Sequence, residues 1–306
     1  MFIGRERELQ ALERLFYSDH FEFAVIYGRR RVGKTALISR FIQDKDAIYF
    51  MGVESSEKQN LENLSKSIME YSSGIEAETS FLSFQAALEY VFRLAEKKRV
   101  ILTIDEYPYV ARASKSLAST LQLLIDKYKE ASKLMLILCG SSMSYMEDQV
   151  LAYKAPLYGR RTAQFKILPF NFFETCHYFR NFSPSDCALI YGIAGGTPQY
   201  LLQMDDSMSV DENIKNTFLN SSSALFEEPE NLLKQEVREP SLYNAIISAI
   251  ASGASKLSEI STKVGENSST CTAYLKTGKR TPKKQFTRLR TTCSASGTGL
   301  FLIMPP

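Results

Sequence analysis

The stretch GRRRVGKT, residues 28–35, has the residue types and the spacing of a phosphate-binding loop, GxxxxGK[ST]. The apolar run FEFAVIY precedes it and helical periodicity follows it, so we expect a strand, the loop and a helix in that order. A glycine-rich turn lets several backbone N–H groups converge on a phosphate, and the helix adds the positive end of its dipole. In such a loop Lys34 reaches the β- and γ-phosphates and the Thr35 hydroxyl binds Mg²⁺. The alternative is a basic turn that contains two glycines by chance.

A second segment, RVILTIDEYPYVA at residues 99–111, supplies the acidic groups that such a loop needs. Its apolar part is typical of a buried parallel strand that ends at Asp105, with Glu106 next. The carboxyl end of this strand faces the loop, so Asp105 can hold the metal and Glu106 can orient and deprotonate a water. This pair favours hydrolysis over transfer to a bound acceptor. The alternative is an acidic strand end without function.

Two further polar positions follow apolar or turn-like segments. Ser141 and Ser142 end the run LMLILCGSS, and we expect Ser141 to sense the γ-phosphate from the neighbouring strand. Serine at a strand end is also an ordinary turn residue. Arg160 and Arg161, in PLYGRRTAQF, precede another strand, where an arginine could neutralise phosphate charge. Solvation of the surface is the alternative for both arginines.

These motifs predict ATP and Mg²⁺ as cofactors. The metal is expected on Thr35 and Asp105, and the catalytic candidates are Glu106, Ser141 and Arg160. The loop residues expected to contact the nucleotide are Gly28, Arg29, Arg30, Arg31, Val32, Gly33, Lys34, Thr35 and Ala36.

The elements that must position these groups alternate between strand and helix up to about residue 170. Apolar runs predict strands at 23–27, 47–51, 100–105, 134–140 and 164–168. Three-and-four spacing predicts helices at 8–16, 35–42, 59–71, 84–97 and 116–131. This order is typical of an α/β fold with a parallel sheet, here of five strands. We therefore assign residues 1–170 to a nucleotide-binding core.

The second half of the sequence is predicted to be helical. Residues 171–239 form a helical lid segment, continuous after the GGTP turn, and Pro240 then opens a smaller unit at residues 240–276. Its three amphipathic stretches, the third with a serine cap, suit a helix-turn-helix or winged-helix unit, and a plain helical cap is the alternative.

Composition narrows the class of protein. The 306 residues are 44% hydrophobic and 23% charged. No apolar run is long enough to span a membrane, and MFIGRERELQ lacks the apolar segment of a signal peptide. We therefore expect a cytoplasmic protein. Five scattered cysteines and two histidines show no metal-ligand spacing. The net charge of +3 comes from the tail, because seven of the 37 Lys and Arg residues, and no acidic residue, follow Glu266. A nucleic-acid partner is therefore only weakly indicated.

Six motifs in order resemble one family, the archaeal-type predicted ATPases of the STAND class of P-loop NTPases, which are relatives of AAA+ proteins. The motifs, spread over residues 2 to about 276, are FIGRERELQALERL, GRRRVGKTALI, ILTIDE, LILCGSSMSYM, PLYGRRTAQF and GGTPQYLL. The resemblance implies an ATPase core with strand order 5-1-4-3-2, a helical segment and a winged helix. It also implies that the N-terminal stretch lies near the adenine and that the GGTP turn reports nucleotide state. The residues concerned are Phe2, Ile3, Gly4 and Arg5 for the adenine, and Gly196, Thr197 and Pro198 for the turn.

The sequence departs from the family pattern after Lys276. Residues 278–306, GKRTPKKQFTRLRTTCSASGTGLFLIMPP, contain no acidic residue, no Trp and no periodicity, and the tail 277–306 is predicted to be disordered. Codons for TRLRTTCSASGTGL, read two bases along, can encode a string similar to the family's YSPADNMFRFWYRF-like ending. We interpret the tail as a frameshifted reading of that ending.

Three functions compete at this stage. The leading one is a signalling ATPase that binds and hydrolyses Mg-ATP and whose nucleotide state switches the helical and C-terminal parts, with a protein partner or a homo-oligomer. The second is a winged-helix DNA-binding regulator that holds nucleotide and turns over little, and KLSEISTKVG is too poor in cations to favour it. The third, a small-molecule kinase, lacks any recognisable acceptor pocket.

Overall fold

The computed structural model describes residues 3–74, 80–236 and 239–277. The chain forms two compact units, Met1–Phe170 and Asn171–Pro306. Phe2 and the tail from residue 278, including its interpretation as a frameshift, lie outside the described residues. Within the described ranges no helix is both long and apolar enough to cross a membrane.

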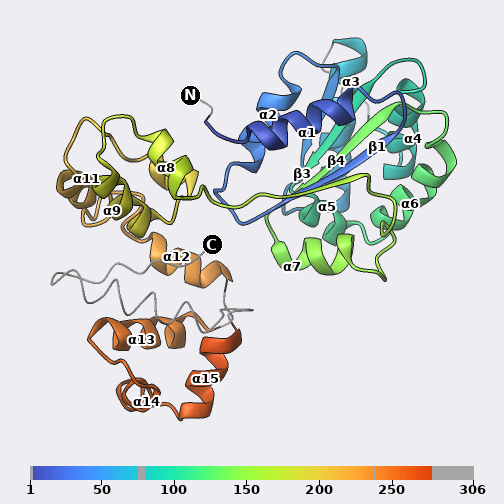
Figure 1. Ribbon diagram of the computed structural model, residues 1–306. Coiled ribbons are helices and arrows are strands. Elements are labelled where there is room, and N and C mark those ends of the chain that lie inside the picture. Colours follow the sequence, from blue (N-terminus) through green and yellow to red (C-terminus); the bar gives the residue numbers. More distant parts are fainter. Residues whose placement is uncertain (1–2, 75–79, 237–238, 278–306) are drawn as a thin grey trace. The chain divides into compact units, whose positions relative to one another are not determined.

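The first unit is built on a parallel five-stranded sheet (Figure 1). Its strands are β1 (Glu22–Tyr27), β2 (Ala47–Met51), β3 (Val100–Asp105), β4 (Leu134–Gly140) and β5 (Ala163–Lys166). Their spatial order is β2-β3-β4-β1-β5. The predicted α/β class and the strand order 5-1-4-3-2 are both confirmed. β1 begins one residue before its predicted range of 23–27, and β5 lies slightly earlier than its predicted range of 164–168.

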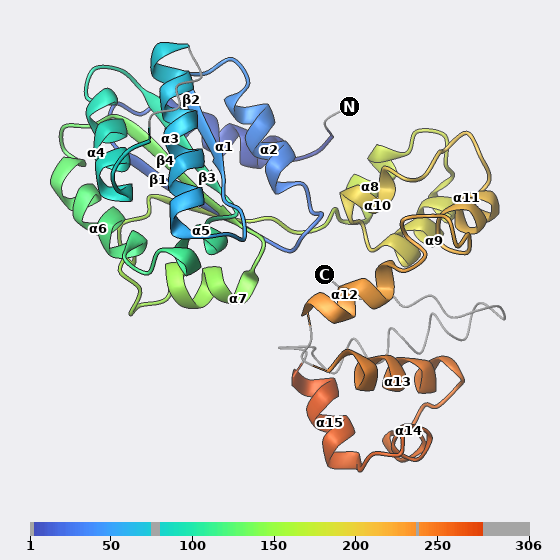
Figure 2. The same cartoon turned by 180° about the vertical axis from the view of Figure 1, so that it is seen from behind.

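Helices cover both faces of this sheet (Figures 1 and 2). α1 (Glu6–Phe16) and α2 (Lys34–Ile42) pack on one face, and α3 (Glu57–Ser73), α4 (Phe84–Leu94), α5 (Tyr107–Ala113) and α6 (Leu117–Tyr128) pack on the other. Alternate residues of β1 enter the two cores, since Val25 contacts the α3–α6 side and Ile26 the α1–α2 side. Both faces are therefore buried, which explains why β1, β3 and β4 are largely apolar, with Glu22, Thr103 and Asp105 as the polar exceptions.

Between Asp105 and the predicted helix 116–131 the chain forms an additional helix. α5 begins directly after Glu106 and carries Pro108 in its first turn, where a missing N–H costs nothing. After β4, the short α7 (Met143–Tyr145) continues into the π-helical η1 (Met146–Leu151). Both insertions start at the carboxyl ends of central strands, so they border the predicted site.

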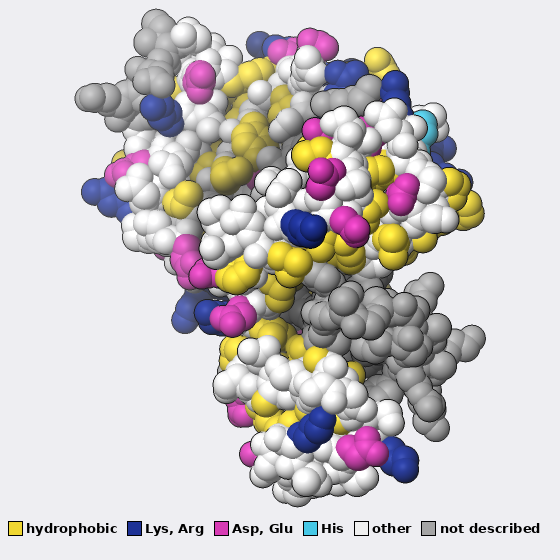
Figure 3. Space-filling view, turned by 90° about the vertical axis from the view of Figure 1, so that its left-hand side faces the viewer, with side chains coloured by type: hydrophobic (Ala, Val, Ile, Leu, Met, Phe, Trp, Pro, Cys, Tyr) yellow, Lys and Arg dark blue, Asp and Glu magenta, His cyan; other side chains and the backbone are white. Residues whose placement is uncertain are grey.

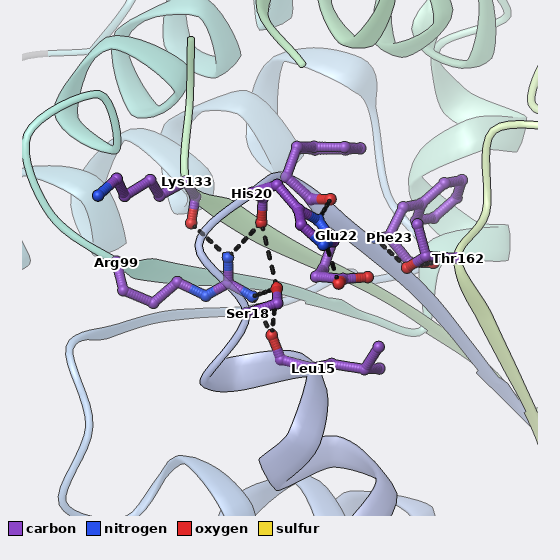
Figure 4. A network of polar contacts seen from close by, with 9 residues as sticks. Leu15, Ser18, His20, Glu22, Phe23, Arg99, Lys133 and Thr162 are labelled. Atoms are coloured by element: carbon purple, nitrogen blue, oxygen red, sulfur yellow. Dashed lines mark hydrogen bonds and ion pairs between the residues drawn. The ribbon is translucent and has the colours of Figure 1, made fainter. Parts of the chain in front are cut away.

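At the opposite, amino-terminal edge of the sheet, Arg99 links several chain segments by hydrogen bonds (Figure 4). Arg99 directly precedes β3. One guanidinium nitrogen donates to the carbonyl oxygens of His20 at 2.6 Å and Lys133 at 3.0 Å, and the other donates to the carbonyl of Leu15. These carbonyls belong to the ends of α1, the approach to β1 and the approach to β4. Burial lowers the pKa of the Arg99 guanidinium below its ordinary value. This cation therefore ties three distant segments together.

Helices are the only regular secondary structure among the described residues of the second unit. Its helices are α8 (Phe172–Tyr178), α9 (Pro184–Ala194), α10 (Pro198–Leu201), α11 (Val210–Thr217), α12 (Glu228–Glu236), α13 (Pro240–Ala251), α14 (Leu257–Val264) and α15 (Ser268–Thr277). Capping boxes start α8, α9 and α11, each pairing an Asn or Ser with an acidic residue three positions on. Continuous helix from the GGTP turn to residue 239 was a wrong expectation, because loops at 202–209 and 218–227 divide it.

Helices α13 to α15 surround a small core of their own. Ile246, Ala249, Ala254, Ile260 and Cys271 are buried in it. Asn267 caps α15, since its side-chain oxygen accepts the Thr270 N–H at 2.8 Å, where the sequence had suggested a serine cap. Residues 239–277 contain no strand, and a wing would follow them, so the winged helix and the boundaries 171–239 and 240–276 stay predictions.

Candidate nucleotide-binding site

The loop between β1 and α2 depends on its two glycines for different reasons. A Cβ at Gly28 would lie 2.2 Å from the carbonyl oxygen of Ile167, so the chain can pass β5 here only without a side chain. Gly33 has φ +90° and directly precedes α2, in the left-handed region that glycine adopts without strain. The backbone thus turns sharply and presents the amino end of α2 at the carboxyl edge of the sheet.

Lys34 is folded into this loop. Its side chain is 6% exposed, and Nζ donates to the carbonyl oxygens of Gly28 at 3.1 Å and Arg29 at 2.9 Å. Burial lowers the pKa of the Lys34 ammonium from its ordinary value of 10.5, and the carboxylates of Asp105 and Glu106 act in the opposite direction. The ammonium is therefore desolvated and bound to neutral carbonyls, an arrangement that an anion can improve.

Asp105 lies at the centre of a converging set of hydrogen-bond donors. The carboxylate is 1% exposed, and its Oδ2 accepts the hydroxyls of Thr35 at 2.9 Å and Tyr49 at 2.8 Å. Its Oδ1 accepts the backbone N–H of Glu106 at 2.8 Å. The buried thiol of Cys139 also lies against Asp105, and burial raises the pKa of that thiol well above its ordinary value. Every oxygen of the carboxylate is thus engaged.

The donor set at Thr35 and Asp105 fits Mg²⁺. Proteins hold this ion with one or two oxygen ligands together with nucleotide phosphates rather than with a full protein cage. The hydroxyl of Thr35 and the carboxylate of Asp105 would hold the metal beside the loop.

Glu106 has a strained backbone and a fixed side chain. Its φ of +49° lies in the left-handed region, which costs energy for a residue with a side chain. Its Oε2 accepts both the Oγ–H of Ser141 at 2.9 Å and the backbone N–H of Ser141 at 3.3 Å. The structure therefore brings Ser141, expected from the sequence as a phosphate sensor, to the carboxylate of Glu106.

The N-terminal stretch also reaches the loop. Gly4 and Arg5 both have positive φ, at +70° and +71°. Arg5 is 7% exposed, donates to the carbonyl of Val32 at 3.2 Å and to the carbonyl of Leu168, and lies 5.0 Å over the Phe170 ring. Arg5 thus joins the loop to the segment that follows β5. Contact of Ile3, Gly4 and Arg5 with an adenine stays a prediction.

The remaining loop residues differ in what they offer. Val32 is buried in the α1–α2 core, so only its backbone faces the site. Arg30 reaches across to α5, where its guanidinium donates to the Tyr109 hydroxyl at 2.9 Å. Arg29 and Ala36 are exposed and Arg31 is half-buried.

One sequence candidate of the first unit, Arg160, is not brought to the loop. Arg160 makes a two-pronged ion pair with Asp126 of α6, at 2.9 and 2.6 Å, and it precedes β5, so it lies at the amino-terminal edge of the sheet. The expectation that it neutralises phosphate charge in its own chain is not supported. Pro198 starts α10 in the second unit, and its place at the nucleotide stays a prediction.

Sequence reasoning missed Tyr49. Part of the signal was available, because residues 47, 49 and 51 of AIYFM share one face of a strand. The pairing of Met51 with Asp105 comes from the structure alone. Tyr49 therefore lies one step before Asp105 on the face that also carries α2.

A parallel sheet with this strand order, and a loop of this form after β1, define the P-loop NTPase class. A family model described as an ATPase domain predominantly from Archaea matches residues 2–204. The chain belongs to this family.

Relatives and solved structures agree with that membership. An uncharacterized protein of Methanocaldococcus jannaschii is 36% identical over 278 residues, which is 90% of this chain and 60% of that protein. The chain therefore spans about three fifths of the length of this relative. An uncharacterized ATP-binding protein of the same organism is 47% identical over 45 residues, 15% of this chain and 76% of that one.

Two solved structures share the fold. The Walker-type ATPase of Pyrococcus abyssi superposes with a TM-score of 0.59 and 20% identity, over 96% of this chain and 89% of that one. The ORC2 protein of Aeropyrum pernix, solved in ADPNP–ADP complexes, superposes with a TM-score of 0.56 and 13% identity, over 95% and 86% of the two chains.

Proposed function

We propose that this chain binds Mg-ATP at the loop of residues 28–35 and hydrolyses its terminal phosphate. The observation that carries the proposal is the convergence of Thr35, Asp105 and Glu106, with 2.9 Å between the Thr35 hydroxyl and the Asp105 carboxylate and Glu106 next in the chain. A metal-binding pair and a candidate base then stand beside a buried ammonium, Lys34. Membership of an ATPase family supports the same reading.

Each group has a distinct task in this reaction. The backbone of the loop and the Lys34 ammonium bind the phosphates, and phosphate oxygens would replace the two carbonyls that Nζ now contacts. When bound, Mg²⁺ neutralises phosphate charge. The Glu106 carboxylate orients a water and accepts its proton. Ser141 holds that carboxylate through two hydrogen bonds, so it sets where the base points.

The decisive test is Glu106→Gln. The amide keeps the size of the side chain and leaves the loop intact, so ATP affinity should stay within about twofold while turnover falls on the order of 10²-fold. Calorimetric titration with Mg-ATP and a phosphate-release assay measure the two quantities. Unchanged turnover, or a parent protein that does not bind Mg-ATP, would contradict the proposal.

Ser141→Ala tests the positioning of the base. Without its hydroxyl the carboxylate of Glu106 keeps only the longer bond from the backbone, so turnover should fall about tenfold with affinity retained. Ser142→Ala is the matched control, because Ser142 contacts Arg112 at 3.5 Å and not Glu106. Equal effects of the two substitutions would remove Ser141 from the mechanism.

We further propose a signalling role of the STAND type, in which the bound nucleotide changes the conformation of the helical part. Arg5 bonds the loop to Leu168 and stacks on Phe170, the last residue of the first unit, so a change in loop geometry would act on the segment that leads out of this unit. Gly195 and Gly196 have positive φ and Pro198 fixes the next turn, which makes this segment a candidate for reporting nucleotide state. Limited proteolysis after Tyr200 should differ with and without ATP, and Pro198→Ala should change that difference. Identical digestion in both states would argue against a switch.

The DNA-binding alternative has less support. α14 carries one basic and one acidic residue, Lys263 and Glu259, and α13 carries no charged residue. On the face shown in Figure 3, Lys and Arg side chains are scattered among Asp and Glu side chains rather than gathered into a stripe. A protein partner or a second copy of the chain stays a prediction, as does the cytoplasmic location.

A further inference from the structure

Tyr49 reaches the predicted metal site from the edge strand of the sheet. It lies on β2, half-buried, on the face that carries α1 and α2. In the register of β2 and β3, Tyr49 pairs with Thr103 and Met51 pairs with Asp105. The Tyr49 hydroxyl therefore crosses diagonally to Asp105, and the oxygen-to-Oδ2 distance is 2.8 Å.

The Tyr49 hydroxyl donates to the same carboxylate oxygen of Asp105 as the Thr35 hydroxyl does. Asp105 Oδ2 accepts from Thr35, the other predicted metal ligand, and from Tyr49 at nearly equal distances. The other oxygen is held by the Glu106 N–H. The rotation of the carboxylate is thus determined by donors from three different elements.

We propose that Tyr49 is a positioning residue for Asp105, which sets the orientation of that carboxylate toward Thr35 and so the affinity of the site for Mg²⁺. The inference rests on the proposed function, because it assigns a role within the same site. Hydrogen-bonded neighbours of metal ligands commonly change metal affinity by about 10- to 100-fold when they are removed. A purely structural tie between β2 and β3 is the competing account, and it makes different predictions.

Tyr49→Phe separates the two accounts, because it removes one hydroxyl and leaves the ring in place. Tyr71→Phe is the matched control, since the Tyr71 hydroxyl donates to the carboxylate of Asp46 at 3.3 Å, just before β2 and away from the loop. Binding of a fluorescent ATP analogue is followed in a series of Mg²⁺ concentrations and again in EDTA. This readout does not depend on turnover.

We expect the Mg²⁺ concentration for half-maximal nucleotide binding to rise about tenfold in Tyr49→Phe and to stay at the parent value in Tyr71→Phe. Affinity in EDTA should be unchanged, because Lys34 and the loop backbone are intact. In an Asp105→Asn background, the further change Tyr49→Phe should have no additional effect on the Mg²⁺ requirement.

Several outcomes would overturn the inference. A parent-like Mg²⁺ requirement in Tyr49→Phe, or an equal loss of binding with Mg²⁺ and in EDTA, would assign the hydroxyl a structural role only. An additional effect of Tyr49→Phe in the Asp105→Asn background would do the same. In each of these cases the parent still binds Mg-ATP and the proposed function stands, whereas a parent that binds no Mg-ATP overturns the proposed function and this inference with it.

Discussion

Two cations lie at opposite edges of the same sheet and differ in what holds them. Lys34 stands at the carboxyl edge and Arg99 at the amino edge, and burial lowers the pKa of each. Lys34 donates to carbonyls five and six residues away, within its own loop. Arg99 donates to the carbonyls of Leu15, His20 and Lys133, which lie 34 to 84 residues away (Figure 4).

The difference in hydrogen-bond partners indicates which of the two cations can bind a ligand. A cation that joins distant segments is part of the fold, because releasing it leaves several carbonyls unpaired and frees the segments. A cation that bonds only to its own loop can exchange those carbonyls for a better acceptor at little structural cost. On this comparison Lys34 serves binding and Arg99 serves stability.

The substitution with the largest expected effect on ATP binding is Lys34→Met. Loss of charged hydrogen bonds to phosphate should weaken Mg-ATP binding about 10²-fold or more. The nucleotide-free protein should be as stable as the parent or more so, because an ammonium no longer has to be buried. Calorimetric titration and thermal unfolding measure the two effects. Retained ATP affinity would refute the phosphate-loop reading.

Arg99→Met should have the converse effect. It leaves the carbonyls of three segments without their donor, so we expect a loss of about 2 to 4 kcal/mol in the free energy of unfolding. ATP affinity of the folded protein should be unchanged. Lys133→Met is the control, since it removes a surface ion pair with Asp19 and keeps the backbone carbonyl that Arg99 uses, and it should change stability little. A drop in ATP affinity without a drop in stability would reverse the assignment.

The smallest expected effect is a pH dependence. Because the pKa of Lys34 is lowered in the folded state, the unfolded chain binds more protons below 10.5, and stability of the nucleotide-free protein should rise with pH in that window. Urea unfolding between about pH 8 and about pH 10 should show a smaller rise in Lys34→Met than in the parent. Arg99→Met should keep the rise, since an arginine ordinarily stays protonated across this range. Equal slopes in the parent and Lys34→Met would mean that the ammonium is not desolvated.

Much of the first unit could be read from the sequence because it depends on local patterns. Continuous apolar runs predict strands that are buried on both faces, and β1, β3 and β4 have that burial. The motif at residues 28–35 specifies its own backbone, since Gly28 and Gly33 permit a turn that other residues would not. The strand order followed from family resemblance, not from the residues alone. Arg160 precedes β5 in the sequence, and in a parallel sheet this position lies at the amino edge, away from the loop.

Only the tertiary structure decided which side chains meet across strands. The bond from Tyr49 to Asp105 depends on the register of β2 against β3. The bonds from Ser141 to Glu106 depend on the placement of the end of β4 beside the start of α5. Arg99 likewise finds its carbonyls only when α1, β1 and β4 are assembled. Residue type and spacing along one segment set a local conformation. A hydrogen bond of about 3 Å between segments far apart in sequence requires the packed sheet, because its length changes with every shift of register or helix.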